Sequence, residues 1–269
     1  MNLLDFDAFS FDCYGTLIDW EEGIGRVLQA WADDQHLGLN QEDLLTAYAR
    51  HEAETAAATP AALYPEILEA SFRAMGREFG VSVSRQWARR LATSVPDWPA
   101  FPDSHQALVT LGEGHQLIIL SNVDRENFEA SRRRLGINFD HVLTAQDLGS
   151  YKPSPRNFAA LQRLREQQGI PPGRLLHVAQ SLFHDHVPAQ AVGLPTVWIN
   201  RRHAQPGWGA TPPPGCQVKP NWTFPDMAAF AAAYAQARST ASHGPLPGSR
   251  LRSRGAGEED DGMLSPVED

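Results

Sequence analysis

Cysteine is scarce in this chain, and basic residues are outnumbered by acidic ones. Only Cys13 and Cys216 occur in 269 residues, so we expect no disulfide framework and a reducing compartment. The net charge of −9 leaves no basic stripe of the kind that nucleic-acid surfaces need. No apolar run is long enough to span a membrane, and residues 1–5 lack the basic and apolar regions of a signal peptide. The sequence therefore predicts a soluble cytoplasmic protein that binds neither nucleic acid nor membrane.

Helical patterns follow the first 19 residues. Ile24, Val27 and Leu28 recur at helical spacing, and Asn40 is placed to cap the start of a second helix. Two more helical patches cover Tyr64–Phe79 and Ser84–Ser94. No strand pattern interrupts this stretch, so we expect an all-helical insert over residues 20–96.

Beyond residue 96, strand and helix patterns alternate. We predict strands at Gln116–Leu120, Val142–Thr144, Leu175–Ala179 and Thr196–Ile199, and helices near residues 128–135, 155–168, 187–192 and 225–238. This alternation predicts an α/β fold with a Rossmann-like, doubly wound parallel sheet. The core would comprise residues 1–19 and 97–238, with the helical cap between them. Residues 239–269 hold few apolar side chains, and we expect a disordered tail there.

Polar residues stand at the ends of the predicted strands. Asp12 follows the apolar residues 9–11 and precedes Gly15-Thr16, so its carboxylate would lie where open α/β sheets bind ligands. A carboxylate held beside a tight turn can attack an electrophile and form a covalent ester. The alternative is that Asp12 only caps the turn. Three further strand ends carry such residues: Ser121-Asn122, Lys152 and Asp185.

The residue types at these strand ends suit one reaction. Lys152 would supply a fixed positive charge that keeps Asp12 ionised and offsets the charge of an anionic substrate. Ser121 and Asn122 can donate hydrogen bonds to the nucleophile or to the substrate. Thr16 could orient Asp12 through its hydroxyl, although it could equally stabilise the turn.

Asp12-Cys13-Tyr14-Gly15-Thr16-Leu17 resembles the first motif of the haloacid dehalogenase superfamily, an apolar strand followed by D-x-[DY]-G-T-[LV]. The four polar strand ends match the four motifs of that superfamily in order, over residues 5–200. The resemblance implies a helical cap that covers a catalytic aspartate. It also implies hydrolysis of a small anionic substrate through an aspartyl ester.

The fourth motif departs from the pattern of the superfamily's phosphatases. Those enzymes carry Gly-Asp before a second Asp, whereas Gln180 stands here in place of the first Asp and only Asp185 remains. Because Mg²⁺ prefers anionic oxygen ligands, we expect no metal cofactor. The alternative is that Asp12 and Asp185 bind Mg²⁺ weakly. His177, His184 and His186 complete no zinc pattern.

Tyr14 also departs from the phosphatases, which have an aspartic acid there to protonate the leaving alkoxide. Tyrosine, with an ordinary pKa near 10, is a poor replacement, whereas a halide leaves without a proton. The resemblance is therefore closest to the 2-haloacid dehalogenases. It implies that Asp185 activates the water that hydrolyses the ester and that Ser181 positions this water.

One expected substrate contact has no clear residue. Enzymes of that branch present a cap arginine to the substrate, and this chain has no clear match. Arg26 and Arg50 are possible substitutes, and the alternative is that each is a solvated helix residue. Tyr14, Trp20, Asn122 and Phe158 are the predicted substrate-binding residues, with Phe158 where the branch usually has Tyr. Trp20 could instead fill the cap core.

Two other functions stay open. A phosphatase that uses Mg²⁺ despite Gln180 and Tyr14 is the enzymatic alternative. A catalytically inactive relative that binds a metabolite or a protein is the other, although such a protein would not need all four motifs. The sequence also leaves a homodimer open.

Overall fold

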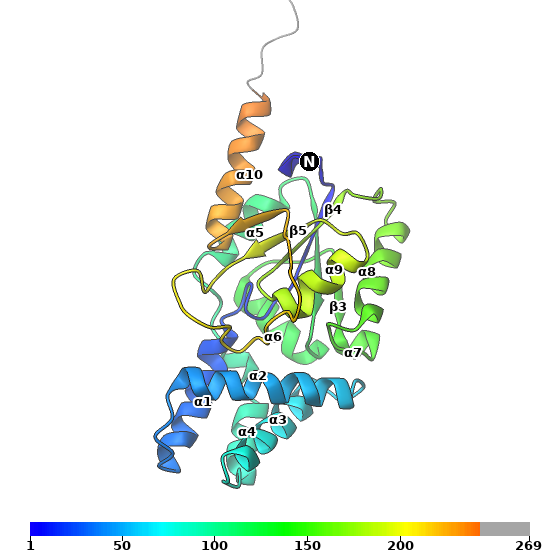
Figure 1. Cartoon of the computed structure of the whole chain (residues 1–269). Helices are drawn as coiled ribbons and strands as arrows, with labels where there is room; N and C mark the ends of the chain where they lie inside the picture. Colours follow the sequence, from blue (N-terminus) through cyan, green and yellow to red (C-terminus); the bar gives the residue numbers. More distant parts are fainter. Residues whose placement is uncertain (243–269) are drawn as a thin grey trace, which may run out of the picture.

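The structure, a computed structural model, describes residues 1–242. Within these residues a parallel sheet of six strands has the order β3-β2-β1-β4-β5-β6 (Figure 1). The strands are β1 (Ala8–Phe11), β2 (Gln116–Ser121), β3 (His141–Thr144), β4 (Leu175–Ala179), β5 (Thr196–Ile199) and β6 (Trp222–Phe224). The chain runs outward from β1 through β2 to β3, and then returns to β4 on the other side of β1. The strand order therefore reverses at β1, the place where such sheets bind ligands.

Alternate residues of the buried strands face two different layers of helices. Phe9 and Phe11 belong to a large apolar cluster that includes residues from α5 (Ser104–Gly112), α6 (Arg125–Leu135) and α10 (Met227–Ser242). Ala8 belongs to a second cluster with residues from α8 (Pro155–Gln167) and α9 (Val187–Ala191). Figure 1 shows α10 and α8 on opposite sides of the sheet. The doubly wound sheet that the alternation predicts is confirmed.

Four helices are inserted between β1 and the core helix α5, as predicted. They are α1 (Trp20–Asp34), α2 (Gln41–Ala58), α3 (Tyr64–Glu78) and α4 (Arg85–Ala92), and they gather beyond one end of the sheet (Figure 1). Asn40 caps α2 as expected, because its side-chain oxygen accepts the N–H of Asp43 at 2.9 Å. We call these helices the cap and the rest of the described chain the core.

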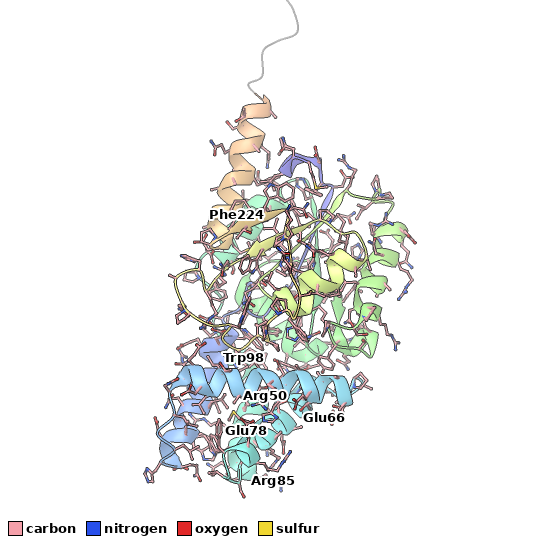
Figure 2. All side chains as sticks on the ribbon, viewed as in Figure 1. Arg50, Glu66, Glu78, Arg85, Trp98 and Phe224 are labelled. Atoms are coloured by element: carbon pink, nitrogen blue, oxygen red, sulfur yellow. The ribbon has the colours of Figure 1, made fainter. Side chains whose placement is uncertain are left out.

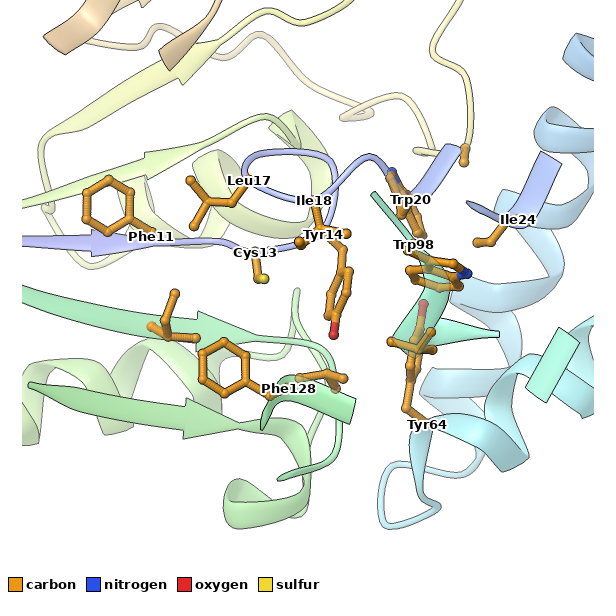
Figure 3. Close-up of a cluster of buried hydrophobic side chains, with 14 of the residues drawn as sticks. Phe11, Cys13, Tyr14, Leu17, Ile18, Trp20, Ile24, Tyr64, Trp98 and Phe128 are labelled. Carbon is orange, nitrogen blue, oxygen red and sulfur yellow. The ribbon is translucent and has the colours of Figure 1, made fainter. Parts of the chain in front are cut away.

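Aromatic rings join the cap to the core (Figure 3). Tyr14, just after β1, packs edge-on against Trp98 at 5.4 Å and stacks with Tyr64 of α3 at 6.2 Å between ring centroids. Trp98 is fully buried where the chain returns from the cap to the core. Gly23 of α1 lies against Trp98, because a Cβ atom at this position would come within 2.2 Å of Trp98 Cδ1.

Several short elements were not predicted. Helix α5 was missed, as were strand β6, the turn of helix α7 (Ala145–Leu148) and the single turns η1 (Leu3–Asp5), η2 (Val95–Asp97) and η3 (Leu182–His186). β6 has three residues, none of them buried, at the sheet edge, so its apolar pattern is too short to identify. α10 continues to Ser242, beyond the boundary expected at 238, and the rest of the predicted tail lies outside the described residues.

None of the helices within residues 1–242 combines the length and the apolar character that a membrane crossing needs.

Replacing Gly23 with alanine tests the close packing of α1 on Trp98. Alanine should gain about 0.5–1 kcal/mol of helix propensity. The displaced indole should cost more, so we expect a net loss of about 1–3 kcal/mol in the free energy of unfolding, measured by urea denaturation. Gly112→Ala is the control, since its added Cβ meets only Leu117 Cδ1 at 3.2 Å. Equal stability of Gly23→Ala and the wild type would contradict the packing argument.

Candidate active site

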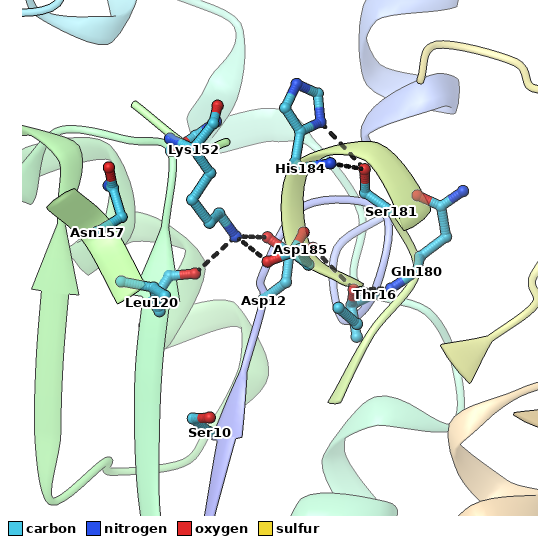
Figure 4. Close-up of polar contacts among 12 residues, drawn as sticks. Ser10, Asp12, Thr16, Leu120, Lys152, Asn157, Gln180, Ser181, His184 and Asp185 are labelled. Atoms are coloured by element: carbon cyan, nitrogen blue, oxygen red, sulfur yellow. Dashed lines mark hydrogen bonds and ion pairs between the residues drawn. The ribbon is translucent and has the colours of Figure 1, made fainter. Parts of the chain in front are cut away.

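Asp12 lies directly after the central strand β1, and both of its carboxylate oxygens accept hydrogen bonds. Oδ1 accepts from Lys152 Nζ and Oδ2 from Thr16 Oγ1, each at 2.8 Å (Figure 4). Gly15 allows the intervening turn, since its φ of 90° lies in the left-handed region that favours glycine. The Thr16 hydroxyl also accepts the backbone N–H of Gln180 at 2.9 Å. Thr16 therefore connects Asp12 to the loop that follows β4.

Lys152 brings the two predicted catalytic carboxylates together. Its Nζ donates to Asp12 Oδ1 at 2.8 Å, to Asp185 Oδ1 at 2.7 Å and to the backbone oxygen of Leu120 at 2.8 Å (Figure 4). These three contacts use all three ammonium protons. The side chain is only 1% exposed. Burial lowers the pKa of Lys152, but the two carboxylates more than offset this and hold it above its ordinary value.

Asp185 sits in the short η3 turn after β4 and is fully buried. Its Oδ1 contacts His177 Nε2 at 3.0 Å as well as Lys152. Because a carboxylate only accepts, Nε2 carries a proton and donates it to Asp185, while His177 Nδ1 lies 2.9 Å from the Ser10 hydroxyl. Oδ2 of Asp185 is also buried and has no hydrogen-bond partner in the described part of the chain.

The shared ammonium affects the two carboxylates differently. Burial raises the pKa of Asp12, and Lys152 offsets this only in part, so it stays above its ordinary value. Burial also opposes ionisation of Asp185, but Lys152 and His177 outweigh it and hold the pKa of Asp185 well below its usual range. Asp185 is thus the more firmly ionised of the pair.

Asn122 and Ser181 hold the loops around the cavity. The Asn122 side chain accepts the backbone N–H of Lys152 at 2.6 Å and donates to its backbone oxygen at 3.0 Å. Ser181 accepts the backbone N–H of His184 at 2.9 Å. Ser121 ends β2 with a buried hydroxyl that makes no hydrogen bond to any described residue. Of these three predicted residues, Asn122 and Ser181 line the cavity.

A cavity opens beside Asp12 between the core and the cap, with about 520 Å³ of empty space including its mouth. Its core side includes Asp12, Lys152, Ser181 and Asp185. Tyr14, Trp20, Tyr64 and Tyr151 contribute aromatic surface, and Glu52, Ala53, Ala56 and Ile67 line it from the cap. The cavity places the predicted nucleophile within reach of a small molecule.

Phe158 does not line this cavity. It is fully buried between α8 and the sheet, where its ring packs edge-on against His177 at 5.2 Å between centroids. The substrate contact predicted for Phe158 is therefore not made, because the residue lies on the inner face of α8. Phe158 instead packs beside His177, whose ring donates a hydrogen bond to Asp185.

The expected cap arginines also lie away from the cavity. Arg50 pairs with Glu78 on the cap surface (Figure 2), and Arg26 pairs with Glu22. Sequence reasoning missed Glu52 and Tyr151 instead. Glu52 could have been found, because it falls on the buried face of α2 at i+4 from Tyr48 and i−4 from Ala56, where a charged residue is unusual.

The donor set beside Asp12 does not fit a magnesium site. Mg²⁺ needs oxygen ligands in octahedral geometry, with anionic groups preferred. Here an ammonium contacts both carboxylates, and the Gln180 amide oxygen accepts instead from Thr211 at 3.3 Å. Among residues 1–242, no three His, Cys, Asp or Glu side chains come together as metal ligands would. His177, His184 and His186 each bond to different partners.

Replacing Lys152 with methionine tests how far the site depends on this ammonium. The variant leaves two neighbouring carboxylates buried without a cation, which should cost about 3–5 kcal/mol in the free energy of unfolding at pH 7. This cost should shrink as the pH falls toward 4, because a buried carboxyl without its cation takes up a proton readily. Lys219→Met, at the chain's other lysine and exposed, should change stability by less than about 0.5 kcal/mol. Equal stabilities for the two variants at both pH values would refute the role of Lys152 as the cation that stabilises both buried carboxylates.

Known proteins of similar fold include several dehalogenases. A defluorinating L-2-haloacid dehalogenase superposes with a TM-score of 0.67 at 20% identity, over 86% of this chain and 95% of the other. An L-2-haloacid dehalogenase from Xanthobacter autotrophicus with chloropropionic acid covalently bound superposes with a TM-score of 0.64 at 17% identity, over 84% of this chain and 97% of the other. YfnB from Bacillus subtilis, a putative HAD-hydrolase bound to magnesium, superposes with a TM-score of 0.65 at 18% identity, over 87% of this chain and 99% of the other. At these identities the likeness shows the fold.

No curated protein matches the sequence of this chain. A family model for haloacid dehalogenase-like hydrolases matches residues 6–181, which include Asp12, Ser121, Lys152 and Ser181. This match spans more than half of the chain and agrees with the parallel sheet and the inserted cap. The chain therefore belongs to the haloacid dehalogenase-like hydrolases.

Proposed function

We propose that this hydrolase displaces a halide from carbon through an ester on Asp12, the chemistry of the 2-haloacid dehalogenases. The substrate would be a small molecule whose halide sits on the carbon beside a carbonyl group. The observation that carries this proposal is the environment of Asp12. Its carboxylate borders a cavity between the core and the cap, and Lys152 and Thr16 hold it in one orientation.

The first step forms the ester. A carboxylate oxygen of Asp12 attacks the carbon that carries the halide, a carbon–oxygen bond forms, and the halide departs with the electron pair of the broken bond. Burial raises the pKa of Asp12 and leaves its carboxylate poorly hydrated, so less water must be removed before attack. Lys152 keeps the group ionised at neutral pH despite this burial.

The second step regenerates Asp12. Water attacks the carbonyl carbon of the Asp12 ester, and the bond between this carbon and the substrate oxygen breaks with its electron pair on that oxygen. One proton of the water passes to this oxygen, so the product leaves as an alcohol, and the other proton is released to solvent as the Asp12 carboxylate re-forms. Asp185 is the acceptor for this water, because its Oδ2 has no other partner among the described residues. Since its pKa lies well below the usual range, Asp185 orients the water and stabilises the charge that develops on it.

Tyr14 favours halide displacement over phosphate ester cleavage. Its hydroxyl lies 2.9 Å from the Ser131 hydroxyl, and burial raises its pKa well above 10. Such a phenol is a poor proton donor to an alkoxide, whereas a halide needs no proton. The lack of fit for Mg²⁺ points the same way, and no step of the proposed reaction involves a metal.

Chloride release from 2-chloropropionate and 2-chloropropionamide, beside phosphate release from p-nitrophenyl phosphate, tests this function. Each assay is run with Mg²⁺ and with a chelator. We expect chloride release that the chelator leaves unchanged and that Asp12→Asn lowers at least about 10³-fold. Magnesium-dependent phosphate release without chloride release would instead support the phosphatase alternative.

The Tyr14→Phe variant tests whether this hydroxyl takes part in the chemistry. We expect chloride release to stay within about threefold of the wild type, whereas loss of a general acid lowers a rate about 10²–10⁴-fold. Stability should fall by about 1 kcal/mol, because the bond with Ser131 is lost. Ser131→Ala is the matched control and should cost a similar amount. A rate loss of a hundredfold in Tyr14→Phe alone would give this residue a catalytic role.

A further inference from the structure

A carboxyl group faces the cavity from the cap. Glu52 belongs to α2, is only 8% exposed and lines the same cavity as Asp12. Tyr64 Oη donates to its Oε1 at 2.9 Å, which fixes the orientation of the group. Oε2 makes no hydrogen bond to any described residue, and it is not fully buried. Oε2 therefore keeps accessible surface and is available to a ligand.

The charges around the cavity disfavour a second anion. Among the described residues that line it, Lys152 is the only cation, and its three protons already contact Asp12, Asp185 and a backbone oxygen. His184 lines the cavity in its neutral form, because burial lowers its pKa to about 4. With Glu52 ionised, three carboxylates face one ammonium. A free carboxylate on the substrate would be repelled and would find no cation to bind.

The neighbours of Glu52 suit a group that donates hydrogen bonds. Tyr14, Tyr64 and Trp20 present aromatic rings to the cavity, and such rings attract ammonium groups and pack well against amides. Tyr64 occupies only Oε1, so an N–H group can reach Oε2.

We propose that Glu52 is a specificity-determining residue, which accepts a hydrogen bond from an amide or amine N–H of the substrate and excludes a free carboxylate there. This inference rests on the proposed dehalogenation and narrows its substrate to halogenated amides or amines. Glu52 is thus an acidic residue on the cap side of the cavity, where neither Arg26 nor Arg50 lies.

The selectivity should depend on pH. Burial raises the pKa of Glu52 to about 7, although the bond from Tyr64 lowers it. The other titratable groups around the cavity are Tyr14, Tyr64, Tyr151, Lys152, Asp12, His184 and Asp185, while Tyr48 precedes Glu52 by one turn of α2. Burial raises the pKa of each of these four tyrosines, so none of them ionises near pH 7. As the pH falls below 7, Glu52 becomes neutral and a carboxylate is excluded less strongly.

Calorimetric binding of propionamide and propionate to the full chain tests the inference without turnover, since neither compound carries a halide. At pH 8 we expect propionamide to bind the wild type at least about tenfold more tightly than propionate. Glu52→Gln keeps the acceptor for Tyr64 and removes the charge, and should narrow this ratio to within about threefold. Lowering the pH to 6 should also narrow the ratio of the two affinities in the wild type. Glu54→Gln, on the same helix with a side chain 65% exposed, should leave the ratio unchanged.

The outcomes separate this inference from the proposed function. Equal binding of the two compounds by the wild type at pH 8, or a ratio that Glu52→Gln leaves unchanged, would overturn the role of Glu52. If the wild type binds propionamide more tightly than propionate but releases no chloride from 2-chloropropionamide, dehalogenation is refuted and the role of Glu52 stands. Should Glu52→Gln fail to fold, the pH dependence of the ratio in the wild type decides, because Glu52 should change the ratio with a midpoint near pH 7. A ratio that stays constant from pH 6 to pH 8 would overturn the role of Glu52.

Discussion

The site depends on one buried ammonium that serves two carboxylates. Lys152 reaches Asp12 after β1, the backbone of Leu120 in β2 and Asp185 after β4, so a single side chain joins three neighbouring strand ends. Neither carboxylate could stay ionised at this depth without it, because removing an unpaired charge from water costs several kcal/mol. The reversal of strand order at β1 makes this arrangement possible, since it opens the crevice in which the three groups meet.

Sharing the ammonium leaves the site with an excess of negative charge. His177 adds a hydrogen bond on the side of Asp185, where its ring donates to the oxygen that also contacts Lys152. Asp12 has only the hydroxyl of Thr16 as a second donor, and burial keeps its pKa above the ordinary value. This imbalance suits the proposed roles. The weakly solvated Asp12 would be the better nucleophile, and the firmly ionised Asp185 would orient water without competing for the substrate.

The core and the cap have different tasks in this arrangement. Asp12, Lys152 and Asp185 belong to the core and would carry out the chemistry, whereas Glu52 and Tyr64 belong to the cap and would choose the substrate. Tyr14 and Trp98 connect the two parts through ring contacts. Because the cap helices form a separate insertion, substitutions in α2 could change the substrate without disturbing the strand ends.

The sequence by itself determined the strands β1 to β5, the inserted helices and the cluster of Asp12, Lys152 and Asp185. Those features follow from local patterns, because an apolar strand that ends in a polar residue brings that residue to a common edge of a parallel sheet. Only the tertiary structure decided which side chains face the cavity from helices. Phe158 and Glu52 both lie on buried helix faces, yet one packs against His177 and the other borders the cavity. That difference depends on how α8 and α2 pack on the rest of the chain, and packing between distant segments leaves no periodic pattern in the sequence.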